Sequence, residues 1–401
     1  MNRSEVSAFI KTHITNREDT LFSADLAGCK KEISKEIFNK SVLVIGGAGT
    51  IGTAFIKALL DFRPARLFVV DQNENGLTEL TRDLRSTSEQ YLPDEFITYP
   101  MDFASESFQR LFFQEGKFDI VANFAAHKHV RSEKDIYAIE AMLENNVFKT
   151  KKLLDMLCKA PPSHFFCVST DKATSPANLM GASKQLMEML LMSYCDRLKI
   201  TTARFANVAF SNGSLLDGYL QRLYKLQALS CPENIRRYFI SPEESGQICL
   251  IACLMGKSGD IFFPRLSSED LKSFKEITIS FLKAHGLDIQ VCKTEQEAKA
   301  HFIALGEAYP VYFFPSATTG EKLEEEFYSP EDQVNFDEFS SLGIIKSQLK
   351  IRIRDIDGLL SDLQSILVSE SVRKSDIINL LGSFLQDFQH HETGKSLDQQ
   401  M

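Results

Sequence analysis

The sequence predicts an α/β fold in which a doubly wound parallel sheet carries a smaller C-terminal lobe. Short apolar runs alternate with segments of helical length over the first half of the chain, and a glycine-rich turn follows the first run. Strands buried on both faces of a parallel sheet form such apolar runs, because the connecting helices cover both sides. The alternation becomes irregular after about residue 205, where we expect the lobe to begin.

Five apolar runs are the strand candidates, and the intervals between them are long enough for helices. Consecutive parallel strands need a crossover connection, usually a helix. The order of strand, glycine-rich turn, helix and second strand indicates a Rossmann-like fold, which binds ligands at the carboxyl ends of its strands. The runs are Ser41–Ile45, Leu67–Val70, Ile97–Tyr99, Ile120–Asn123 and Phe165–Val168.

We divide the chain into four segments. Residues 1–39 are polar with scattered apolar positions, which predicts a helical extension, and residues 40–212 are expected to form the nucleotide-binding domain. Residues 213–350 are expected to form mainly a substrate-binding lobe, which can return strands to the sheet. Residues 351–401 are expected to form a helical tail, whose apolar stripe over Ile377–Phe388 packs on the body of the protein or on another subunit.

Composition narrows the class of protein. The 401 residues are 44% hydrophobic and 25% charged, which is ordinary for a globular protein. The formal net charge of -9 argues against binding to nucleic acid or to an anionic membrane, although backbone amides can still bind phosphate. The eight cysteines form no CxxC pair, which indicates the reduced thiols of a cytoplasmic protein. The longest apolar run, residues 248–255, is far shorter than the roughly 20 residues that span a bilayer, so we expect no membrane span.

The glycine-rich turn predicts a dinucleotide cofactor. Its small residues let the backbone turn tightly and bring its amides to a pyrophosphate. Asp71 ends the second strand about 22 residues after Gly49, where a carboxylate accepts the ribose hydroxyls and repels a 2′-phosphate. We therefore expect NAD rather than NADP, with a helix-capping role as the alternative for this aspartate. The cofactor contacts expected in the turn are Gly46, Gly49, Thr50, Ile51 and Gly52.

Two further strand ends carry candidate ligand contacts. Asp102 and Phe103 follow the third strand, where a dinucleotide fold places residues against adenine, although a surface turn explains them equally well. Ala125 follows the fourth strand and is small enough to let the chain pass close to the cofactor. His127 and Lys128 come next, and we expect them near the nicotinamide and the substrate. No cluster of metal ligands with suitable spacing accompanies this loop, so we expect no metal.

The end of the fifth strand carries the candidate catalytic residues. Ser169–Lys172 lies at the ligand edge of the sheet, and Lys184 is placed about three helical turns later. These positions match an extended short-chain dehydrogenase/reductase, in which a tyrosine four residues before the lysine takes the substrate hydroxyl proton. Here that position is Met180, whose thioether cannot do acid–base work. None of the ten tyrosines has a lysine four residues later.

With these motifs the chain resembles the nucleotide-sugar 4,6-dehydratases of bacterial polysaccharide biosynthesis, which act on UDP-N-acetylglucosamine. The likeness covers about residues 40–335. It is closest to the subgroup with methionine at the tyrosine position, whose larger members are membrane-anchored, and we expect this chain to be a soluble form. The segments that carry the likeness are Ala126–Val130, Ser169–Ala173, Arg204–Val208, Arg237–Phe239 and Thr319–Leu323.

The resemblance assigns roles to the strand-end residues. Removal of the C4 hydride to NAD gives a 4-ketone, which acidifies the C5 proton. Lys172 is the expected base for that proton, and Asp171 is the expected acid for the departing C6 hydroxyl. Return of the hydride to C6 regenerates NAD, so the cofactor is expected to stay tightly bound. Thr170 is the hypothetical acceptor of the 4-hydroxyl proton in place of Met180, and Lys184 is expected to contact the nicotinamide ribose.

The resemblance also implies substrate contacts. Asn207 and Ser214 are expected at the sugar diphosphate. Arg237, Arg265 and Glu321 are expected in the nucleotide half, since a guanidinium group makes paired hydrogen bonds with a phosphate. An ordinary surface or interdomain ion pair is the alternative for either arginine.

Other functions share these features. A nucleotide-sugar epimerase shares the fold and the 4-keto step but needs no C6 acid, so the Asp171–Lys172 pair favours a dehydratase. A 5,6-dehydratase or a 5-inverting dehydratase would use nearly the same residues. A non-catalytic NAD-binding regulator is a different class, favoured by the missing tyrosine. Asn146 matches a family asparagine that holds its helix in place, and because family members commonly associate we expect a homo-oligomer.

Overall fold

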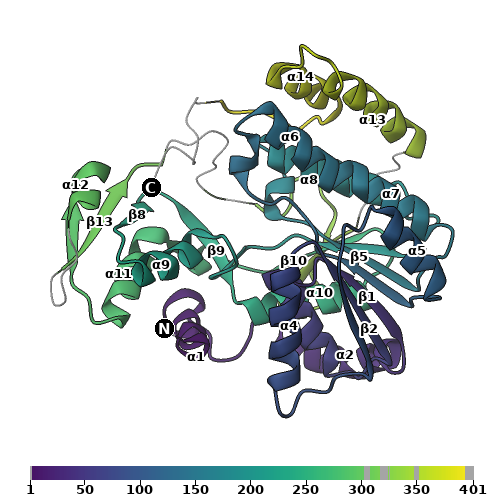
Figure 1. Cartoon of the computed structure of the whole chain (residues 1–401), viewed down its shortest axis with the longest axis horizontal. Coiled ribbons are helices and arrows are strands. Elements are labelled where there is room, and N and C mark those ends of the chain that lie inside the picture. Colours follow the sequence, from purple (N-terminus) through teal and green to yellow (C-terminus); the bar gives the residue numbers. More distant parts are fainter. Residues whose placement is uncertain (1, 302–307, 317–323, 325, 347–351, 393–401) are drawn as a thin grey trace.

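A nine-stranded sheet with helices on both faces forms the larger part of the molecule (Figure 1). The computed structural model describes residues 2–301, 308–316, 324, 326–346 and 352–392. The seven strands from β10 to β3 are parallel, whereas β15 is antiparallel to β10 and β14 is antiparallel to β15. The predicted doubly wound α/β fold is therefore confirmed. In spatial order the strands are β14 (Val334–Asn335), β15 (Leu342–Lys346), β10 (Asp260–Pro264), β6 (Ile200–Ala203), β5 (His164–Val168), β4 (Ile120–Asn123), β1 (Ser41–Ile45), β2 (Arg66–Asp71) and β3 (Glu95–Pro100).

The central strands are apolar on both faces because each face packs against its own layer of helices. In β1, Val42 and Val44 lie in one hydrophobic core, and Leu43 and Ile45 lie in the other. This burial on both faces explains the continuous apolar runs in the sequence. The helices of the first layer are α2 (Ser23–Ile37), α3 (Thr50–Leu60), α4 (Glu74–Ser86) and α10 (Pro242–Met255), and those of the second are α5 (Glu106–Gln114), α6 (Ile136–Leu143), α7 (Lys149–Leu157) and α8 (Leu179–Met192).

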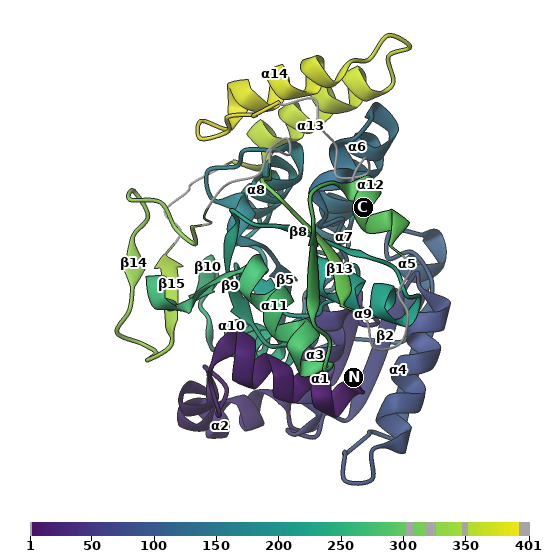
Figure 2. The ribbon, with the colours of Figure 1, turned by 90° about the vertical axis from the view of Figure 1, so that its left-hand side faces the viewer.

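A smaller lobe contains two three-stranded sheets and lies beside the carboxyl edge of the large sheet (Figures 1 and 2). The segment 213–350 supplies most of this lobe, but it also supplies β10, β14 and β15 to the large sheet. The lobe strands are β7 (Asn207–Val208), β9 (Arg236–Ile240) and β11 (Leu271–Ser273) in one sheet, and β8 (Leu229–Pro232), β13 (Tyr309–Phe314) and β12 (Ile289–Cys292) in the other; its helices are α9 (Leu215–Tyr224), α11 (Phe274–Ala284), α12 (Glu295–Ala300) and the short turn η5 (Ser268–Asp270).

The N-terminal extension contacts both parts of the molecule. Helix α1 (Arg3–Phe9) continues into a π-helical turn, η1 (Ile10–Thr15), and Phe9 packs with Phe281 in the core of the lobe (Figure 2). The following helix, α2, packs instead against the first layer of the large sheet. The first 39 residues therefore link the lobe to the sheet.

The C-terminal helices α13 (Ile353–Leu367) and α14 (Lys374–Phe384) cover the outer side of α6, α7 and α8 (Figure 1). Ile377, Leu381 and Phe388 are buried in the same core as Leu186 of α8. The apolar stripe of the tail therefore packs on the body of its own chain.

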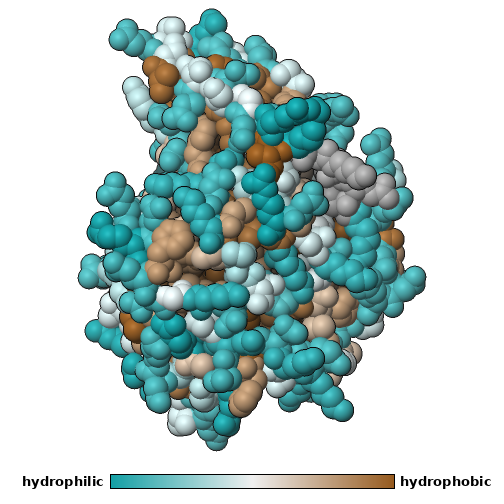
Figure 3. Space-filling view, turned by 90° about the vertical axis from the view of Figure 1, so that its right-hand side faces the viewer, coloured by the Kyte–Doolittle hydropathy of each residue, from teal (hydrophilic) through white to brown (hydrophobic). Residues whose placement is uncertain are grey.

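The exterior seen in Figure 3 is mainly hydrophilic, with apolar side chains scattered singly or in small groups. Across the described ranges, we find no helix with the length and apolar character that a membrane crossing requires.

Candidate functional site

The glycine turn after β1 is held by close contacts with neighbouring backbone. Gly46 has a φ of +74°, and a Cβ atom there would lie 2.5 Å from the amide nitrogen of Ala125. A Cβ atom on Gly52 would lie 2.4 Å from the carbonyl oxygen of Gly46. These two glycines are therefore required by the packing of the protein itself, and the backbone of Ala125 lies against the turn.

Gly49 differs, because a Cβ atom there would approach the protein no closer than 3.5 Å, an ordinary contact. Gly49 is the N-cap of α3 and makes no side-chain cap hydrogen bond. The first N–H groups of a helix, here those of Thr50 and Ile51, have no intrahelical acceptor and carry partial positive charge. An open glycine at this helix start fits a diphosphate that lies over the turn, as NAD requires.

Asp71 stands at the carboxyl end of β2, beside this turn. Its carboxylate accepts hydrogen bonds from the amides of Ala48 at 3.0 Å and Asn73 at 2.9 Å. The cap of α4 is made by Asn73, whose side chain accepts from the amide of Gly76. Asp71 is half-buried and its oxygens have further acceptor capacity, so it can hold the turn and still accept ribose hydroxyls.

Asp102 and Phe103 have protein partners of their own. One carboxylate oxygen of Asp102 accepts from the amide of Ala104 at 2.8 Å, and the other pairs with the ammonium of Lys149. The Phe103 side chain is 4% exposed and belongs to a hydrophobic core. Only the backbone of Phe103 is therefore available to a cofactor.

Asn146 links the loop after β4 to helix α8. It lies in the π-helical turn η3 (Glu144–Phe148), and its side chain accepts from the amide of His127 at 2.8 Å. Its amide group donates to the His127 carbonyl at 2.9 Å and to the Ser183 hydroxyl at 3.0 Å. These contacts agree with the structural role expected for Asn146.

A cavity of about 750 Å³ separates the carboxyl edge of the large sheet from the lobe. Its walls come from the loops after β4, β5 and β6 and from α8, α9 and the lobe strands. The other predicted cofactor residues do not line the cavity and lie at the carboxyl ends of β1 to β4. They are Gly46, Gly49, Thr50, Gly52, Asp71, Asp102, Phe103 and Ala125. The predicted residues that line the cavity are Ile51, Lys128, Thr170, Asp171, Lys172, Lys184, Asn207 and Ser214.

Three predicted catalytic residues share one carboxylate oxygen. Thr170 caps the short turn η4 (Asp171–Ala173), and its hydroxyl donates to Asp171 Oδ1 at 2.8 Å. The Lys172 ammonium donates to the same oxygen at 3.0 Å, and the Lys172 amide donates to it at 2.9 Å. Asp171 is buried, whereas Lys172 is partly exposed to the cavity. A proton can therefore pass between these groups without an intervening water.

Lys184 and Met180 lie on the first two turns of α8 and both line the cavity. The Lys184 ammonium donates to the Val168 carbonyl at 2.8 Å and lies 3.0 Å from the sulfur of Met187. Burial lowers the pKa of Lys184. Met180 is 1% exposed and has only a thioether at the position where short-chain dehydrogenases/reductases carry a tyrosine.

A buried ion pair beside the segment Thr170–Lys172 was not predicted. The Arg204 guanidinium donates to both carboxylate oxygens of Glu188, at 2.9 and 2.7 Å, and the Ser169 hydroxyl donates to Glu188 at 2.5 Å. Both charged residues are less than a tenth exposed. One signal was available in the sequence, because Glu188 is four residues after Lys184 and so lies on the same face of α8.

The cavity is cationic although the protein is acidic. Burial and the neighbouring Lys128 lower the pKa of His129 to about 4, so this histidine is neutral at pH 7. Burial also lowers the pKa of Lys128, partly offset by Asp217. Such a charge balance favours an anionic ligand. Among the residues that the structure describes, the charged groups in the walls are the cations Lys128, Arg131, Lys172, Lys184 and Arg222 and the carboxylates Asp171 and Asp217.

Three predicted substrate residues do not line this cavity. His127 contributes its backbone to the Asn146 contacts instead. Arg237 is buried in β9, where its guanidinium donates to the Arg236 carbonyl at 2.9 Å. Arg265 is exposed, with its guanidinium over the Phe336 ring.

The backbone explains the position of Arg265. Its amide donates to the carbonyl of Ser341, which continues the antiparallel pairing of β10 with β15. Glu321, with the rest of the predicted segment Thr319–Leu323, lies outside the described residues.

Residues 385–391 of the C-terminal tail cross the loop that joins Lys172 to α8. The amides of Gln389 and His391 donate to the carbonyls of Pro176 and Ala177, at 3.1 and 3.2 Å. The segment thus contacts the chain a few residues after the candidate catalytic residues Thr170–Lys172.

A buried side-chain contact strengthens this crossing. His390 Nε2 lies 3.3 Å from a carboxylate oxygen of Glu133, which ends the short turn η2 (Val130–Glu133). The same oxygen accepts from the Leu179 amide at the start of α8, at 2.9 Å.

Comparison with known proteins places the chain in a family. Residues 42–347 match the family described as polysaccharide biosynthesis proteins. An uncharacterised membrane protein of Methanocaldococcus jannaschii is 28% identical over 79% of this chain and 88% of its own length. The capsular polysaccharide biosynthesis protein CapD of Staphylococcus aureus is 28% identical over 57% of this chain, and the match covers 38% of the length of CapD. An inverting UDP-N-acetylglucosamine 4,6-dehydratase of Campylobacter jejuni is 23% identical over 82% of this chain and 89% of its own.

Solved structures share the fold. Pen from Bacillus thuringiensis superposes with a TM-score of 0.64 at 22% identity, over 79% of this chain and 90% of its own. A double mutant of DesIV, a dTDP-glucose 4,6-dehydratase from Streptomyces venezuelae solved with NAD, superposes with a TM-score of 0.54 at 18% identity, over 71% and 87%. The family match over residues 42–347 shows that the chain belongs to the polysaccharide biosynthesis proteins, here with the fold of the extended short-chain dehydrogenases/reductases.

Proposed function

We propose that the protein is an NAD-dependent nucleotide-sugar 4,6-dehydratase that converts UDP-N-acetylglucosamine to a UDP-4-keto-6-deoxy-N-acetylhexosamine. The observation that carries the proposal is the shared oxygen of Asp171, which binds both Thr170 and Lys172 at the ligand edge of the sheet. An epimerase needs no such acid–base pair beside C6. The Campylobacter relative, matched over 89% of its length, supports the same substrate and reaction.

The residues of the cavity divide the proton chemistry. Bound NAD, held by the glycine turn and Lys184, would supply the hydride acceptor for C4 and the hydride donor for C6. The proton of the C4 hydroxyl passes through Thr170 to the Asp171 carboxylate across their 2.8 Å contact, and the neutral Lys172 amine removes the C5 proton and returns a proton to C5 at the end of the cycle. Asp171 then protonates the departing C6 hydroxyl, so the pair gains one proton and loses one in the elimination.

The other candidate residues would bind the cofactor and the sugar nucleotide. Gly49 and the start of α3 would hold the cofactor diphosphate, and Asp71 would hold the adenosine ribose. Lys184 would contact the nicotinamide ribose from the floor of the cavity. Asn207 and Ser214, with the cations of the walls, would bind the sugar diphosphate.

The direct test incubates the purified protein with UDP-N-acetylglucosamine and follows the mass of the sugar nucleotide. Loss of one water is expected. GDP- and dTDP-linked sugars, run in parallel, test the choice of base. Unchanged mass with a change in the sugar's configuration at C4 would instead establish the epimerase, and bound NAD without any conversion would establish a regulator.

We expect replacement of Thr170 by valine to slow formation of the 4-ketone by about tenfold or more, because valine is isosteric but cannot accept or relay the 4-hydroxyl proton. Thr170→Ser keeps the hydroxyl that donates to Asp171 and should retain turnover. Stopped-flow absorbance of reduced NAD measures the step. Full turnover in Thr170→Val would assign the proton to another group.

Gly49→Ala should weaken NAD binding about tenfold while the stability of the cofactor-free protein stays unchanged, since the added methyl meets only ordinary contacts within the chain. Gly52→Ala is the contrast, because its methyl would lie 2.4 Å from a carbonyl and should cost about 1–3 kcal/mol of stability. Calorimetric NAD titration and urea unfolding separate the two effects. Equal NAD affinity in wild type and Gly49→Ala would place the diphosphate elsewhere.

His390→Ala should lower kcat severalfold with little change in KM, because the tail then holds the loop after Lys172 less firmly. It should also cost about 1–3 kcal/mol of stability through the loss of the buried contact with Glu133. His391→Ala is the matched control, since His391 is exposed and contacts the loop through its backbone amide. If both variants behave alike, His390 does not position the loop.

A further inference from the structure

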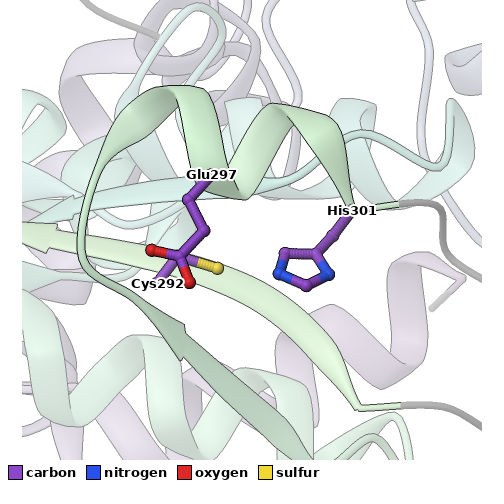
Figure 4. Close-up of side chains that lie close together, drawn as sticks. All are labelled: Cys292, Glu297 and His301. Atoms are coloured by element: carbon purple, nitrogen blue, oxygen red, sulfur yellow. The ribbon is translucent and has the colours of Figure 1, made fainter.

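A cysteine, a glutamate and a histidine converge in the lobe, on elements that do not line the cavity. Cys292 ends β12, Glu297 lies on α12, and His301 directly follows that helix. Their ligand atoms all lie within 4.8 Å of one another. Figure 4 shows the thiol, carboxylate and imidazole gathered between the strand and the helix.

The chemistry of the three groups suits one cation. Thiolate, carboxylate and imidazole are the side chains that bind Zn²⁺ in proteins. Cys292 is 2% exposed, and its sulfur lies within 4.8 Å of the ligand atoms of Glu297 and His301. A divalent ion deprotonates a coordinating thiol and would lie between the thiolate and the carboxylate. From these contacts we propose that Cys292, Glu297 and His301 bind a Zn²⁺ ion in the lobe.

The geometry needs only a small adjustment. Zinc–ligand distances of about 2.0–2.3 Å place tetrahedral ligands roughly 3.3–3.8 Å apart, so closure by about 1 Å through side-chain rotation completes the set. Gln290 on β12 places its amide nitrogen 3.0 Å from Nε2 of His301. A half-turn of that amide would bring its oxygen to Nε2, where it can accept the ring N–H and leave Nδ1 for the ion. Glu297 is exposed, so water can take the fourth position.

The ion would be structural rather than catalytic. It would join the end of β12 to the end of α12, and β12 pairs with β13, which contributes Phe314 to the wall of the cavity. The expectation of no metal came from the loop after β4, and the cluster in the lobe was not predicted.

The test uses the full chain, stripped with a chelator and titrated with Zn²⁺ and separately with Co²⁺. One Zn²⁺ per chain is expected after gel filtration, measured by mass spectrometry of the metal. Bound Co²⁺ should show a thiolate-to-cobalt absorption band together with the intense visible bands of tetrahedral geometry. Zn²⁺ should also raise the Tm of the wild type.

Cys292→Ser should lose the thiolate band and the Tm shift, and His301→Gln should lose tight binding. Cys158→Ser and His285→Gln keep the three ligands and should bind like wild type, while circular dichroism of the metal-free variants checks that each folds. Substoichiometric zinc in the wild type, or an unchanged thiolate band in Cys292→Ser, would overturn the proposal.

Discussion

Lys172→Met should lower the rate of water elimination by about 10²–10⁴-fold, because the variant keeps the length of the side chain but removes the base for the C5 proton. Asp171→Asn should have a similar effect, since it removes the acid for the C6 hydroxyl and leaves the hydrogen-bonding positions occupied. Both variants should still bind NAD, because neither residue lies in the glycine turn.

The two variants also separate the chemical steps. Formation of the 4-ketone should persist in Lys172→Met, so one turnover of substrate should leave reduced NAD on the enzyme, visible by its absorbance. Lys152→Met, at an exposed lysine on α7, is the control and should be fully active. Retention of more than about a tenth of wild-type turnover in Lys172→Met would remove this lysine from the reaction.

Arg204→Met should destabilise the protein by about 3–5 kcal/mol, the largest effect on stability that we expect from a single change. The substitution leaves the buried Glu188 carboxylate without the guanidinium that binds both of its oxygens. The remaining Ser169 hydroxyl is one donor for a full charge. Urea unfolding, monitored by circular dichroism, measures the change.

The double variant Glu188→Met/Arg204→Met serves as the control for this prediction. Removing both charges removes the unpaired ion, so at least half of the lost stability should return. A single variant that loses less than about 1 kcal/mol would mean that water enters and solvates Glu188.

The central strands could be predicted because their signals are local. β1 and β4 have the predicted bounds, Ser41–Ile45 and Ile120–Asn123, since each is an apolar run that ends at a turn. The pairing of β14, β15 and β10 at one edge of the sheet could not be predicted in the same way. Ile261 of β10 pairs with Ile345 of β15, and neither strand carries a local mark of so distant a partner.

The candidate site shows the same division. Thr170, Asp171 and Lys172 are consecutive at a strand end, so the sequence alone placed them together. The pairing of Glu188 with Arg204 depends on how α8 packs over β6, which is a tertiary property. Arg265 was expected at the substrate, and in the structure its guanidinium lies over the Phe336 ring, outside the walls of the cavity.

The crossing of the tail over the loop that joins Lys172 to α8 could likewise not be predicted from the sequence. The stripe over Ile377–Phe388 predicted an amphipathic helix, and its periodicity left open whether the helix packs on its own chain or on another subunit. The contact between His390 and Glu133 joins residues that lie 257 positions apart in the sequence. It became visible only with the packing of α13 and α14.

The most direct test of the account is the mass of the product formed from UDP-N-acetylglucosamine in heavy water. A 4,6-dehydratase exchanges the C5 hydrogen with solvent, so the product should lose one water and carry one carbon-bound deuterium, at C5. A 5,6-dehydratase would lose water without gaining carbon-bound deuterium. A product of unchanged mass, or no product, would contradict the assignment of Asp171 and Lys172 to the elimination of water.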